Sequence, residues 1–560
     1  MADGTVATHQ YNRGWQEPGQ LSVDPLELGT QSKIPVLDAR MRIIGSSYEE
    51  SLRSLAAKIW LIDNAEFTVD AAYYIFKRDM VGYAFLGALC EAVKRGVDVR
   101  LMVDSLGSID IAHTELKALE NCAIDAGFVK NTNGQLSTTK ARVQTVVFNA
   151  FSNIFINYNR RSHDKLLVVD GAFPELATAM TGGRNISISY YGLHDDGSQD
   201  PNAYKDLEIV VKPQAGASDE ESIALISEYY FSILFSYERN KRLHTNLAYE
   251  KELSKFEYNL TKLRKNSDFN NAYSDMPTYL NDLRDGKVLL AHELANLENS
   301  NVVGEYDKNL MKNPNSIMAV MDRIGDANEE NGVIRIVSPY FFISQYERKD
   351  GTVYFDDMDG IQDWLEAHPN NRLEIITNSV LTSDNFFAQA IIDMNTAPRL
   401  LLNKEYEDSW RDKDMKDSEQ KSELVTATAW QEMVSNPRIK VYQTGKLDSI
   451  LLGGNTDYGK LHAKFVLGKE NIGFVGTSNF DDRSKLYNNE MGYFFQSKDL
   501  VNDLKAEFEL LKSQSYLWGS PEWLEMRQKV RESGTTKGNW TKKQRSTFKR
   551  LYSSKLHWQF

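Results

Sequence analysis

The stretch Ser162-His163-Asp164-Lys165-Leu166-Leu167-Val168-Val169-Asp170 decides the fold prediction, because a related stretch, Leu461-His462-Ala463-Lys464-Phe465-Val466-Leu467, occurs late in the chain. In both stretches a histidine and a lysine lie two residues apart next to an apolar run typical of a strand, so their side chains project on the same side. Each stretch leads to a glycine-containing turn that ends in asparagine: Gly182-Gly183-Arg184-Asn185 and Gly476-Thr477-Ser478-Asn479. The chain therefore carries two copies of one unit.

This unit has the residue types needed to handle a phosphate group. A lysine provides a point charge for the phosphate oxygens, as predicted for Lys165 and Lys464, and a histidine acts as nucleophile or proton carrier. Amide side chains and backbone N–H groups of a turn add neutral donors to the same oxyanion. The predicted phosphate-binding positions in the two turns are Asn185, Asn479, Gly183 and Thr477. Two copies facing each other would supply an attacking and a protonating histidine.

With these motifs the chain resembles the phospholipase D superfamily, whose signature H-x-K-x-x-x-x-D followed by G-[GS]-x-N occurs twice. The resemblance extends from about residue 45 to 525 and is strongest toward the bacterial cardiolipin synthase branch. Segments outside the motifs also match: Tyr73-Tyr74-Ile75-Phe76, Ala92 to Asp104, Val337-Ser338-Pro339-Tyr340-Phe341, Thr377-Asn378-Ser379 and Asn479 to Ser484. The resemblance implies a phosphodiesterase or phosphatidyltransferase that acts on phospholipids through a phosphohistidine.

The resemblance also implies roles for the site residues, with no metal or cofactor required. His163 corresponds to the nucleophile and His462 to the general acid/base, although the residues alone permit the reverse. Asp206 in Tyr-Lys-Asp-Leu-Glu and Glu490 in Asn-Asn-Glu-Met-Gly correspond to carboxylates that orient the two imidazoles. The alternative for both carboxylates is that they are surface acids.

The second copy departs from the signature at one position. Asp170 completes the first motif and is grouped with its catalytic residues, but we expect it to brace the turn after the strand. Lys469 stands at the corresponding position of the second copy, with Glu470 beside it. If Asp170 is structural, this difference need not abolish catalysis. If Lys469 marks decay of the second half, the protein would be a binding module or a poor enzyme.

Periodicity along the chain predicts an α/β fold. Helical spacing at Ser47 to Phe67 and Tyr83 to Lys94 alternates with strand patterns at Phe67 to Phe76 and Val97 to Val103, and the same order recurs between Val333 and Thr377. We expect two phospholipase D-like α/β/α sandwich halves in pseudo-two-fold arrangement, with the active site at their interface. The predicted parts are an N-terminal arm (1–45), a first half (46–235), a helical connector (236–285), a second half (286–525) and a basic, aromatic C-terminal tail (526–560).

Composition limits the choice of substrate and partner. The formal net charge of −13 argues against a general nucleic-acid binder and favours substrates with one or two phosphates. A phospholipid transferase or phospholipase is therefore the leading function, a nuclease of the same superfamily the second, and a non-catalytic phospholipid-binding relative the third. Because both motifs lie in one chain, a monomer is sufficient for the site.

Membrane contact is expected to be peripheral, because the sequence has no apolar run long enough to span a bilayer. The start of the sequence lacks signal-peptide features, although a leader replaced by Met1 is an alternative, so both the bacterial cytoplasm and the cell envelope stay open. The two cysteines, Cys90 and Cys122, imply neither a disulfide framework nor a zinc site, but one bridge between them is possible in principle.

Two stretches bear on lipid contact, each with two interpretations. Lys140 to Arg161 places apolar residues between cationic ends, and is either a membrane-facing or acyl-chain-lining segment or an ordinary core helix. After Glu532 the chain has no acidic residue, while cations mix with Trp540, Phe548, Tyr552 and Trp558. This C-terminal region is either a surface for an anionic bilayer or a packed terminal helix.

Overall fold

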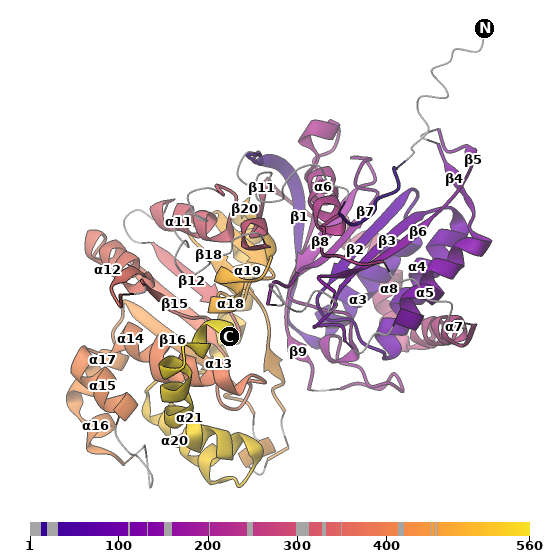
Figure 1. Cartoon of the computed structure of the whole chain (residues 1–560). Helices are drawn as coiled ribbons and strands as arrows, with labels where there is room; N and C mark the ends of the chain where they lie inside the picture. The colour runs from indigo at the N-terminus through magenta and orange to yellow at the C-terminus, as the bar shows by residue number, and fades with distance from the viewer. Residues whose placement is uncertain are drawn as a thin grey trace.

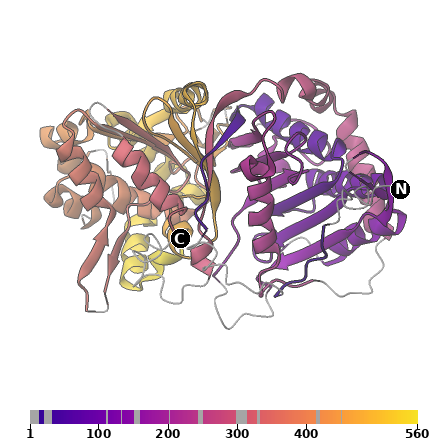
Figure 2. The same ribbon diagram turned by 90° about the horizontal axis from the view of Figure 1, so that it is seen from above.

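Two halves of the chain lie side by side and share one large sheet (Figures 1 and 2). The computed structural model describes residues 13–19, 32–109, 113–131, 133–150, 159–200, 202–242, 250–297, 313–327, 332–348, 350–412, 419, 421–448, 450–452, 454–455 and 457–560. Within these ranges the sheet has 15 strands. Its centre is the antiparallel pair β1 (Leu37–Ile44) and β11 (Arg284–His292), which joins the halves edge to edge.

Outward from this centre the two halves repeat the same strand order, except that the second half has one additional strand at its edge. From β1 the first half continues with β10 (Glu208–Pro213), β8 (Thr178–Gly182), β7 (Lys165–Val169), β2 (Thr68–Tyr73), β3 (Asp98–Asp104) and β6 (Val143–Phe148). From β11 the second half continues with β20 (Met491–Gln496), β19 (Ile472–Gly476), β18 (Phe465–Leu467), β12 (Val333–Val337), β15 (Arg372–Thr377), β16 (Ile439–Thr444) and β21 (Ser515–Leu517). The predicted α/β fold with two similar halves is confirmed.

Helices cover both faces of this sheet, which explains the apolar strands. In β7 the side chains of Leu167 and Val169 pack with α3 (Tyr48–Asp63) and α4 (Met80–Arg95), whereas Leu166 and Val168 pack on the other face with α6 (Ile223–Phe235). A strand buried on both faces needs a continuous apolar run rather than an alternating one. The expected β-α-β order is present as β2-α4-β3 and again as β12, α12 (Asp357–Ala367) and β15.

The ends of α4 show how the sequence sets this unit. Asp79 caps its N-terminus by accepting a hydrogen bond from the backbone N–H of Gly82 at 2.9 Å. Gly96 ends the helix with φ 103°, a left-handed conformation that favours glycine. The chain then enters β3 directly, so the helix is followed at once by the parallel partner of β2.

The predicted N-terminal arm of residues 1–45 is wrong in its last part. Residues 37–44 form β1, paired with β10 on one side and β11 on the other. The alternation of Leu37, Ala39, Met41 and Ile43 with polar residues is the strand signal that the sequence prediction overlooked. The start of the chain thus supplies the strand that joins the two halves.

The helical connector expected over 236–285 contains α7 (Glu250–Lys265), α8 (Ser267–Ser274) and α9 (Met276–Tyr279). It is not only a solvated linker, because Phe256, Leu260 and Leu263 of α7 are buried against the first half. The backbone of α7 comes close to α4 at Gly87, where an added Cβ would lie 2.8 Å from the carbonyl oxygen of Phe256.

The expected C-terminal tail of residues 526–560 is also wrong, since it is packed as α20 (Pro521–Glu532), α21 (Thr536–Ser553) and η8 (Leu556–Gln559). Buried ion pairs hold these helices. Arg527 contacts Asp393 at 2.8 Å and Glu419 at 2.9 Å, and Arg545 of α21 contacts Glu419 at 2.6 Å. Of the two sequence interpretations, the packed terminal helix is confirmed, and contact of this region with an anionic bilayer stays a prediction.

The stretch from Lys140 to Arg161 is not a helix where the structure describes it. Residues 143–148 form β6, and Val146 and Phe148 are buried core residues. Four of the apolar side chains that suggested a membrane-facing segment, Phe151, Ile154, Phe155 and Ile156, lie outside the described residues.

Cys90 of α4 and Cys122 form a disulfide, so the sequence alternative of a single bridge is correct. The bridge ties α4 to η1 (Cys122–Asp125) in the first half. In the described part of the chain, no helix is both long and apolar enough to cross a membrane.

We expect the double substitution Cys90→Ser with Cys122→Ser to lower the free energy of unfolding of the first half by about 3 kcal/mol, since the bridge closes a loop with a sequence separation of 32 residues. Urea unfolding followed by circular dichroism measures this. Reductant should shift the unfolding midpoint of the unsubstituted protein by a similar amount and leave the double variant unaffected. An equal midpoint for the oxidised protein and the variant would contradict a stabilising bridge.

Candidate active site

Each histidine motif is held by backbone contacts to the opposite half. The N–H of His163, just before β7, donates to the carbonyl of Asn489 at 2.9 Å. The N–H of His462 donates to the carbonyl of Lys205 at 2.8 Å, beside the parallel pair β9 (Tyr204–Lys205) and β17 (Lys460–Leu461). The two motifs are therefore brought to the boundary between the halves, where the sequence predicted the site.

The side chains of the two histidines also pair with residues of the opposite half. Nδ1 of His163 lies 2.9 Å from Oε2 of Glu490, and Nδ1 of His462 lies 2.7 Å from Oδ2 of Asp206. Both carboxylates have no exposed surface, so neither is a surface acid. With Nδ1 of each ring donating to a carboxylate, Nε2 is the nitrogen left for chemistry.

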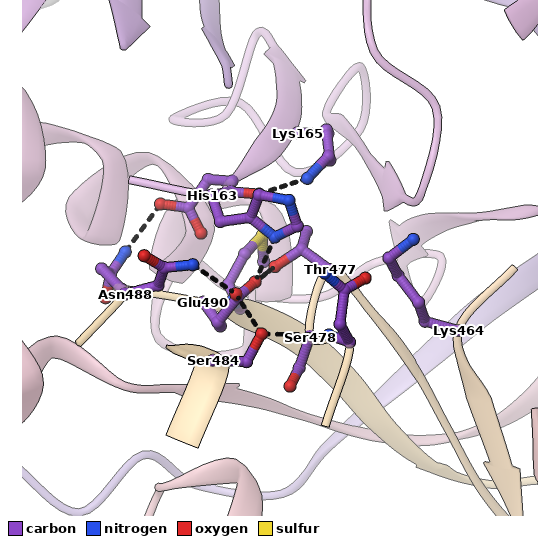
Figure 3. Close-up of polar contacts among 12 residues, drawn as sticks. His163, Lys165, Lys464, Thr477, Ser478, Ser484, Asn488 and Glu490 are labelled. Atoms are coloured by element: carbon purple, nitrogen blue, oxygen red, sulfur yellow. Dashed lines mark hydrogen bonds and ion pairs between the residues drawn. The ribbon is translucent and has the colours of Figure 1, made fainter. Parts of the chain in front are cut away.

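Hydrogen bonds fix the Glu490 carboxylate (Figure 3). Its Oε2 accepts from Thr477 Oγ1 at 2.7 Å, and its Oε1 accepts from Ser484 Oγ at 2.8 Å. Asn488 Nδ2 adds a longer bond of 3.3 Å to Oε1. A carboxylate held on both oxygens cannot rotate freely, so the ring of His163 is oriented by a fixed partner.

Asp206 is placed by the first glycine turn. Its Oδ1 accepts from the N–H of Leu207 at 2.8 Å. A Cβ on Gly183 would lie 2.0 Å from this same Oδ1, so a side chain at residue 183 would displace the carboxylate. The second glycine of the turn is thus required to make room for the partner of His462.

Lys165 and Lys464 lie beside the histidines rather than on the cavity wall. The ammonium group of Lys165 donates to the carbonyl of His163 at 2.6 Å, and that of Lys464 donates to the carbonyl of His462. Lys464 Nζ is also 2.9 Å from Nδ1 of His462, but that nitrogen lies closer to Asp206 and donates its proton there. Figure 3 shows both lysines around His163. The charges of both lysines act on the two imidazoles at short range. Direct contact of either lysine with a phosphate stays a prediction.

Asn185 and Asn479 both line the cavity that contains the two histidines. Asn185 accepts from the N–H of Ile75 at 2.9 Å and donates to the hydroxyl of Tyr190 at 2.8 Å. The side-chain oxygen of Asn479 is buried and has no hydrogen-bond partner among the described residues. A buried amide oxygen without a partner is costly, which is typical of a group that awaits a ligand or water.

The expectation that Gly183 and Thr477 bind phosphate is wrong. The N–H of Gly183 donates to the carbonyl of Leu207 at 3.1 Å, and the N–H of Thr477 donates to that of Met491 at 2.8 Å. The hydroxyl of Thr477 is used on Glu490. Both residues therefore support the orienting carboxylates instead of presenting donors to the cavity.

Asp170 has the structural role that we expected, and it is not a catalytic residue. Its carboxylate accepts hydrogen bonds from three successive backbone N–H groups, those of Glu66, Phe67 and Thr68, at 2.7 to 2.9 Å. It follows the last residue of β7, whereas His163 precedes the first, so about 20 Å of strand separates them. Lys469 occupies the equivalent turn of the second half, equally remote from the histidines, and its carbonyl accepts from the N–H of Ile472.

Aromatic rings that the sequence did not single out line both histidines. Tyr74 packs edge-on against His163 at 4.7 Å between ring centroids. Tyr190 and Tyr204 are stacked on each other and pack edge-on against His462 at 5.3 and 5.2 Å. Tyr204 lies only two residues before Asp206, and this proximity to the orienting carboxylate is a signal that could have indicated it.

Asp164, also missed, sits between the histidine and lysine of the first motif. Its carboxylate accepts from Ser162 Oγ, from the hydroxyl of Tyr230 and from Asn489 Nδ2. Asn489 precedes Glu490, so this cluster ties the first motif to the segment that carries its orienting carboxylate.

Burial sets the protonation of the site. Together with the charges of the nearby lysines, it lowers the pKa of His163 well below 6.5 and that of His462 to about 4. Burial likewise lowers the pKa of Lys165 to about 7 and that of Lys464 to about 8. Free imidazoles beside ammonium groups are thus prepared for an anionic ligand.

The two orienting carboxylates differ electrostatically. Burial raises the pKa of Glu490 to about 7. Burial alone would also raise the pKa of Asp206, but the charges of His462 and Lys464 outweigh it and hold the pKa below its usual value. Asp206 is therefore the carboxylate that stays charged and favours a protonated imidazole, that of His462.

The cavity with both histidines has a volume of about 960 Å³. Besides the site residues it is lined by α21, by α13 (Phe386–Ile391) and by the segment around Arg483. It is large enough for a phosphodiester with a sizeable head group.

Residues 59–197 and 320–512, more than half of the chain, match the protein family described as "Cardiolipin synthase, PLD-like domain". Cardiolipin synthase C of Escherichia coli is 24% identical over 487 residues, covering 82% of this chain and 83% of that relative. A cardiolipin synthase of Clostridium perfringens is 32% identical over 134 residues, covering 24% of this chain and 23% of the relative. Among solved structures, phosphatidylserine synthase of Haemophilus influenzae is similar in fold, with a TM-score of 0.55 and 13% identity over 94% of this chain and 96% of that chain.

We expect ¹⁵N spectra of histidine-labelled protein to show His163 and His462 neutral at pH 7 with the proton on Nδ1, where the carboxylates accept it. Asp206→Asn should lower the pKa of His462 further, because the lost carboxylate favours the imidazolium. Asp196→Asn, at an exposed residue, is the matched control and should change neither ring. An unchanged pKa of His462 in Asp206→Asn would contradict its pairing with Asp206.

Proposed function

Because this chain belongs to the cardiolipin synthase family with phospholipase D-like domains, we propose that it transfers a phosphatidyl group from a phospholipid to an alcohol through a phosphohistidine. The observation that carries this proposal is the pair of imidazoles in one cavity, each with Nδ1 on a buried carboxylate from the opposite half. The cardiolipin synthases among the relatives support a phospholipid as substrate.

In the first step Nε2 of one histidine attacks phosphorus and the bond to the leaving alcohol breaks. The other histidine gives its proton to the leaving oxygen. In the second step this histidine takes a proton from the incoming alcohol or water, whose oxygen attacks phosphorus while the P–N bond breaks. The charges of Lys165 and Lys464 and the amides of Asn185 and Asn479 would stabilise the phosphoryl oxygens throughout.

The carboxylates support His163 as nucleophile and His462 as general acid/base. A nucleophile must be neutral, and burial together with Lys165 and Lys464 keeps the pKa of His163 well below 6.5. The first step needs a protonated second histidine, and Asp206 is the carboxylate that remains charged. A bound phosphodiester anion would raise the pKa of His462 and complete its protonation.

The mouth of the cavity supports contact with an anionic membrane surface. Trp540 and Phe387 line it with 38% and 42% of their surface exposed. Lys543 and Arg550 of α21 are exposed beside them, and each cation near an anionic bilayer contributes about 1 kcal/mol. Such a contact would let a lipid head group enter the site without leaving the bilayer.

The remaining partner and location proposals follow from the same structure. One chain supplies both histidines and both carboxylates, so a monomer is sufficient. The Cys90–Cys122 disulfide favours an oxidising compartment such as the cell envelope over the cytoplasm. No feature of the site favours a nuclease, and the net charge of −13 weighs against nucleic acid.

A phosphatidyl-p-nitrophenol donor tests the assignment of the histidines, since its leaving group departs without a general acid. His462→Ala should release about one equivalent of nitrophenol in a burst and then stall, because the phosphohistidine lacks its base. His163→Ala should show no burst. Stopped-flow absorbance and detection of an acid-labile phosphoenzyme measure both outcomes, and a burst confined to His163→Ala would reverse the assignment.

We expect kcat/KM to fall as the pH rises from about 7 to above 8. Lys165 and Lys464 lose their charge in the free enzyme over this range, and with it the attraction for phosphate. On the acid side, loss of activity from protonation of His163 should appear only well below pH 6.5. A pH series with a soluble short-chain donor measures this profile.

Lys464→Arg, whose charge persists to about pH 12, should flatten the alkaline fall. An unchanged alkaline limb in this variant would exclude the lysine charge as its cause.

A further inference from the structure

We propose that the second half carries a separate anion site at the far end of β18, and that this site binds the phosphate of a phosphomonoester. The site is a cavity of about 910 Å³ beside α19 (Lys498–Ser513), and Lys469, Lys498 and Lys505 line it. Lys469 lies at the opposite end of β18 from His462, roughly 20 Å away. This cavity shares no lining residue with the catalytic one, and Figure 1 shows α19 well apart from α21.

Strand pairing identifies the equivalent position in the first half. Val168 of β7 pairs with Asp70 of β2. Leu467, which occupies the place of Val168 in the second motif, pairs with Arg335 of β12. The two halves can therefore be compared residue by residue at this end of the sheet.

In the first half the equivalent space is filled. The Asp170 carboxylate covers three successive backbone N–H groups, and the ring of Phe67 stacks on that of Phe173 at 3.9 Å between centroids. In the second half Lys469 takes the place of Asp170, and Gly332 takes that of Phe67. The turn that carries Phe173 is also shorter there, because two residues rather than seven separate the motif from the next strand. The cavity is the space that these missing side chains leave.

The charges at this end of the sheet are reversed between the halves. In the first half Asp70 and Glu228 of α6 form an acidic site, and the guanidinium of Arg13 occupies it, 2.7 Å from Asp70 and 3.7 Å from Glu228. In the second half Arg335 stands at the position of Asp70, and α19 follows the strand equivalent to the one before α6. The first half thus holds a cation at this position, and the reversed charges of the second half favour an anion.

The lysines of α19 supply most of the positive charge. The helix has three lysines, which are spaced by seven residues and therefore share one face. Lys512 pairs with Glu374. Lys498 and Lys505 are exposed, and neither has an ion-pair partner in the part of the chain that the structure describes. Because α19 begins at the cavity, its N-terminal dipole adds to the field of these two lysines.

The charge of the lining matches a phosphomonoester. Its three lysines are opposed by one acid, Glu470, and Arg335 is balanced by Glu374 and Glu509 at 3.1 and 3.9 Å. The lining residues therefore carry an excess of two positive charges, and a phosphomonoester carries about two negative charges near neutral pH. Apolar side chains beside the lysines can contact the organic part of the ligand: Val333, Leu467 and Val501.

Lysine footprinting tests the site one residue at a time. The full-length protein is acetylated briefly with and without glycerol 3-phosphate, and mass spectrometry gives the rate of modification of each lysine. The phosphomonoester should slow the modification of Lys498 and Lys505 roughly threefold when it is present at twice its Kd. Lys251 of α7 and Lys542 of α21 are exposed, line neither cavity and should be unaffected. Because the readout is not activity, a negative result here would leave the proposed transferase reaction standing.

The variant Lys469→Asp copies the residue of the first half. It should abolish the protection of Lys498 and Lys505, because a carboxylate then opposes the ligand, whereas Lys469→Arg should keep the protection. Lys251→Asp changes the net charge by the same amount at a remote position and is the matched control. Thermal unfolding reports that each variant is folded. Protection that survives Lys469→Asp, or that extends equally to Lys251 and Lys542, would overturn the site.

Two arms of the experiment distinguish a soluble ligand from a lipid head group. Vesicles of phosphatidylcholine with phosphatidic acid present a phosphomonoester on a membrane, and vesicles of phosphatidylcholine alone are their control. Protection of Lys498 and Lys505 by glycerol 3-phosphate supports a soluble ligand. Protection by the phosphatidic acid vesicles alone supports a lipid head group at the same site. Equal rates of modification in every arm would overturn the proposal.

Discussion

The site depends on one constraint, the exchange of carboxylates between the halves. Glu490 orients His163 and Asp206 orients His462, and the backbone N–H of each histidine donates to the residue just before its own orienting carboxylate. Neither half can orient its own imidazole, so the boundary between the halves is also the reaction centre. The central β1–β11 pair holds this boundary in register, because it makes the two sheets one.

A second consequence of the exchange is that similar motifs acquire different electrostatics. Both histidines are buried next to lysines, yet Asp206 remains charged, whereas burial raises the pKa of Glu490 to about 7. Arg184 of the first glycine turn adds to the positive field around Asp206. Two copies of one unit can therefore provide a nucleophile and a general acid with the same reacting residue, histidine, because their carboxylate partners differ in charge.

The C-terminal helices show how packing completes the cavity. Glu419 and Asp393 are fully buried and would be unfavourable without partners, so Arg527 and Arg545 fix α20 and α21 against the second half. This anchorage turns a basic segment into one wall of the site. In α21, Arg545 is paired with the buried Glu419, whereas Lys543 and Arg550 line the cavity.

The sequence by itself determined the duplicated unit, the α/β order and the two histidines, because local period and motif spacing carry them, whereas the two carboxylates were indicated only by the family resemblance. It did not determine which carboxylate serves which histidine, or that Gly183 and Thr477 support carboxylates instead of phosphate. The sequence prediction also placed β1 in an arm and α21 in a tail. The alternating pattern of β1 was a local signal that was overlooked, whereas the buried ion pairs that hold α21 have no local pattern. Contacts between residues far apart in the chain decided these points, and only the tertiary structure contains them.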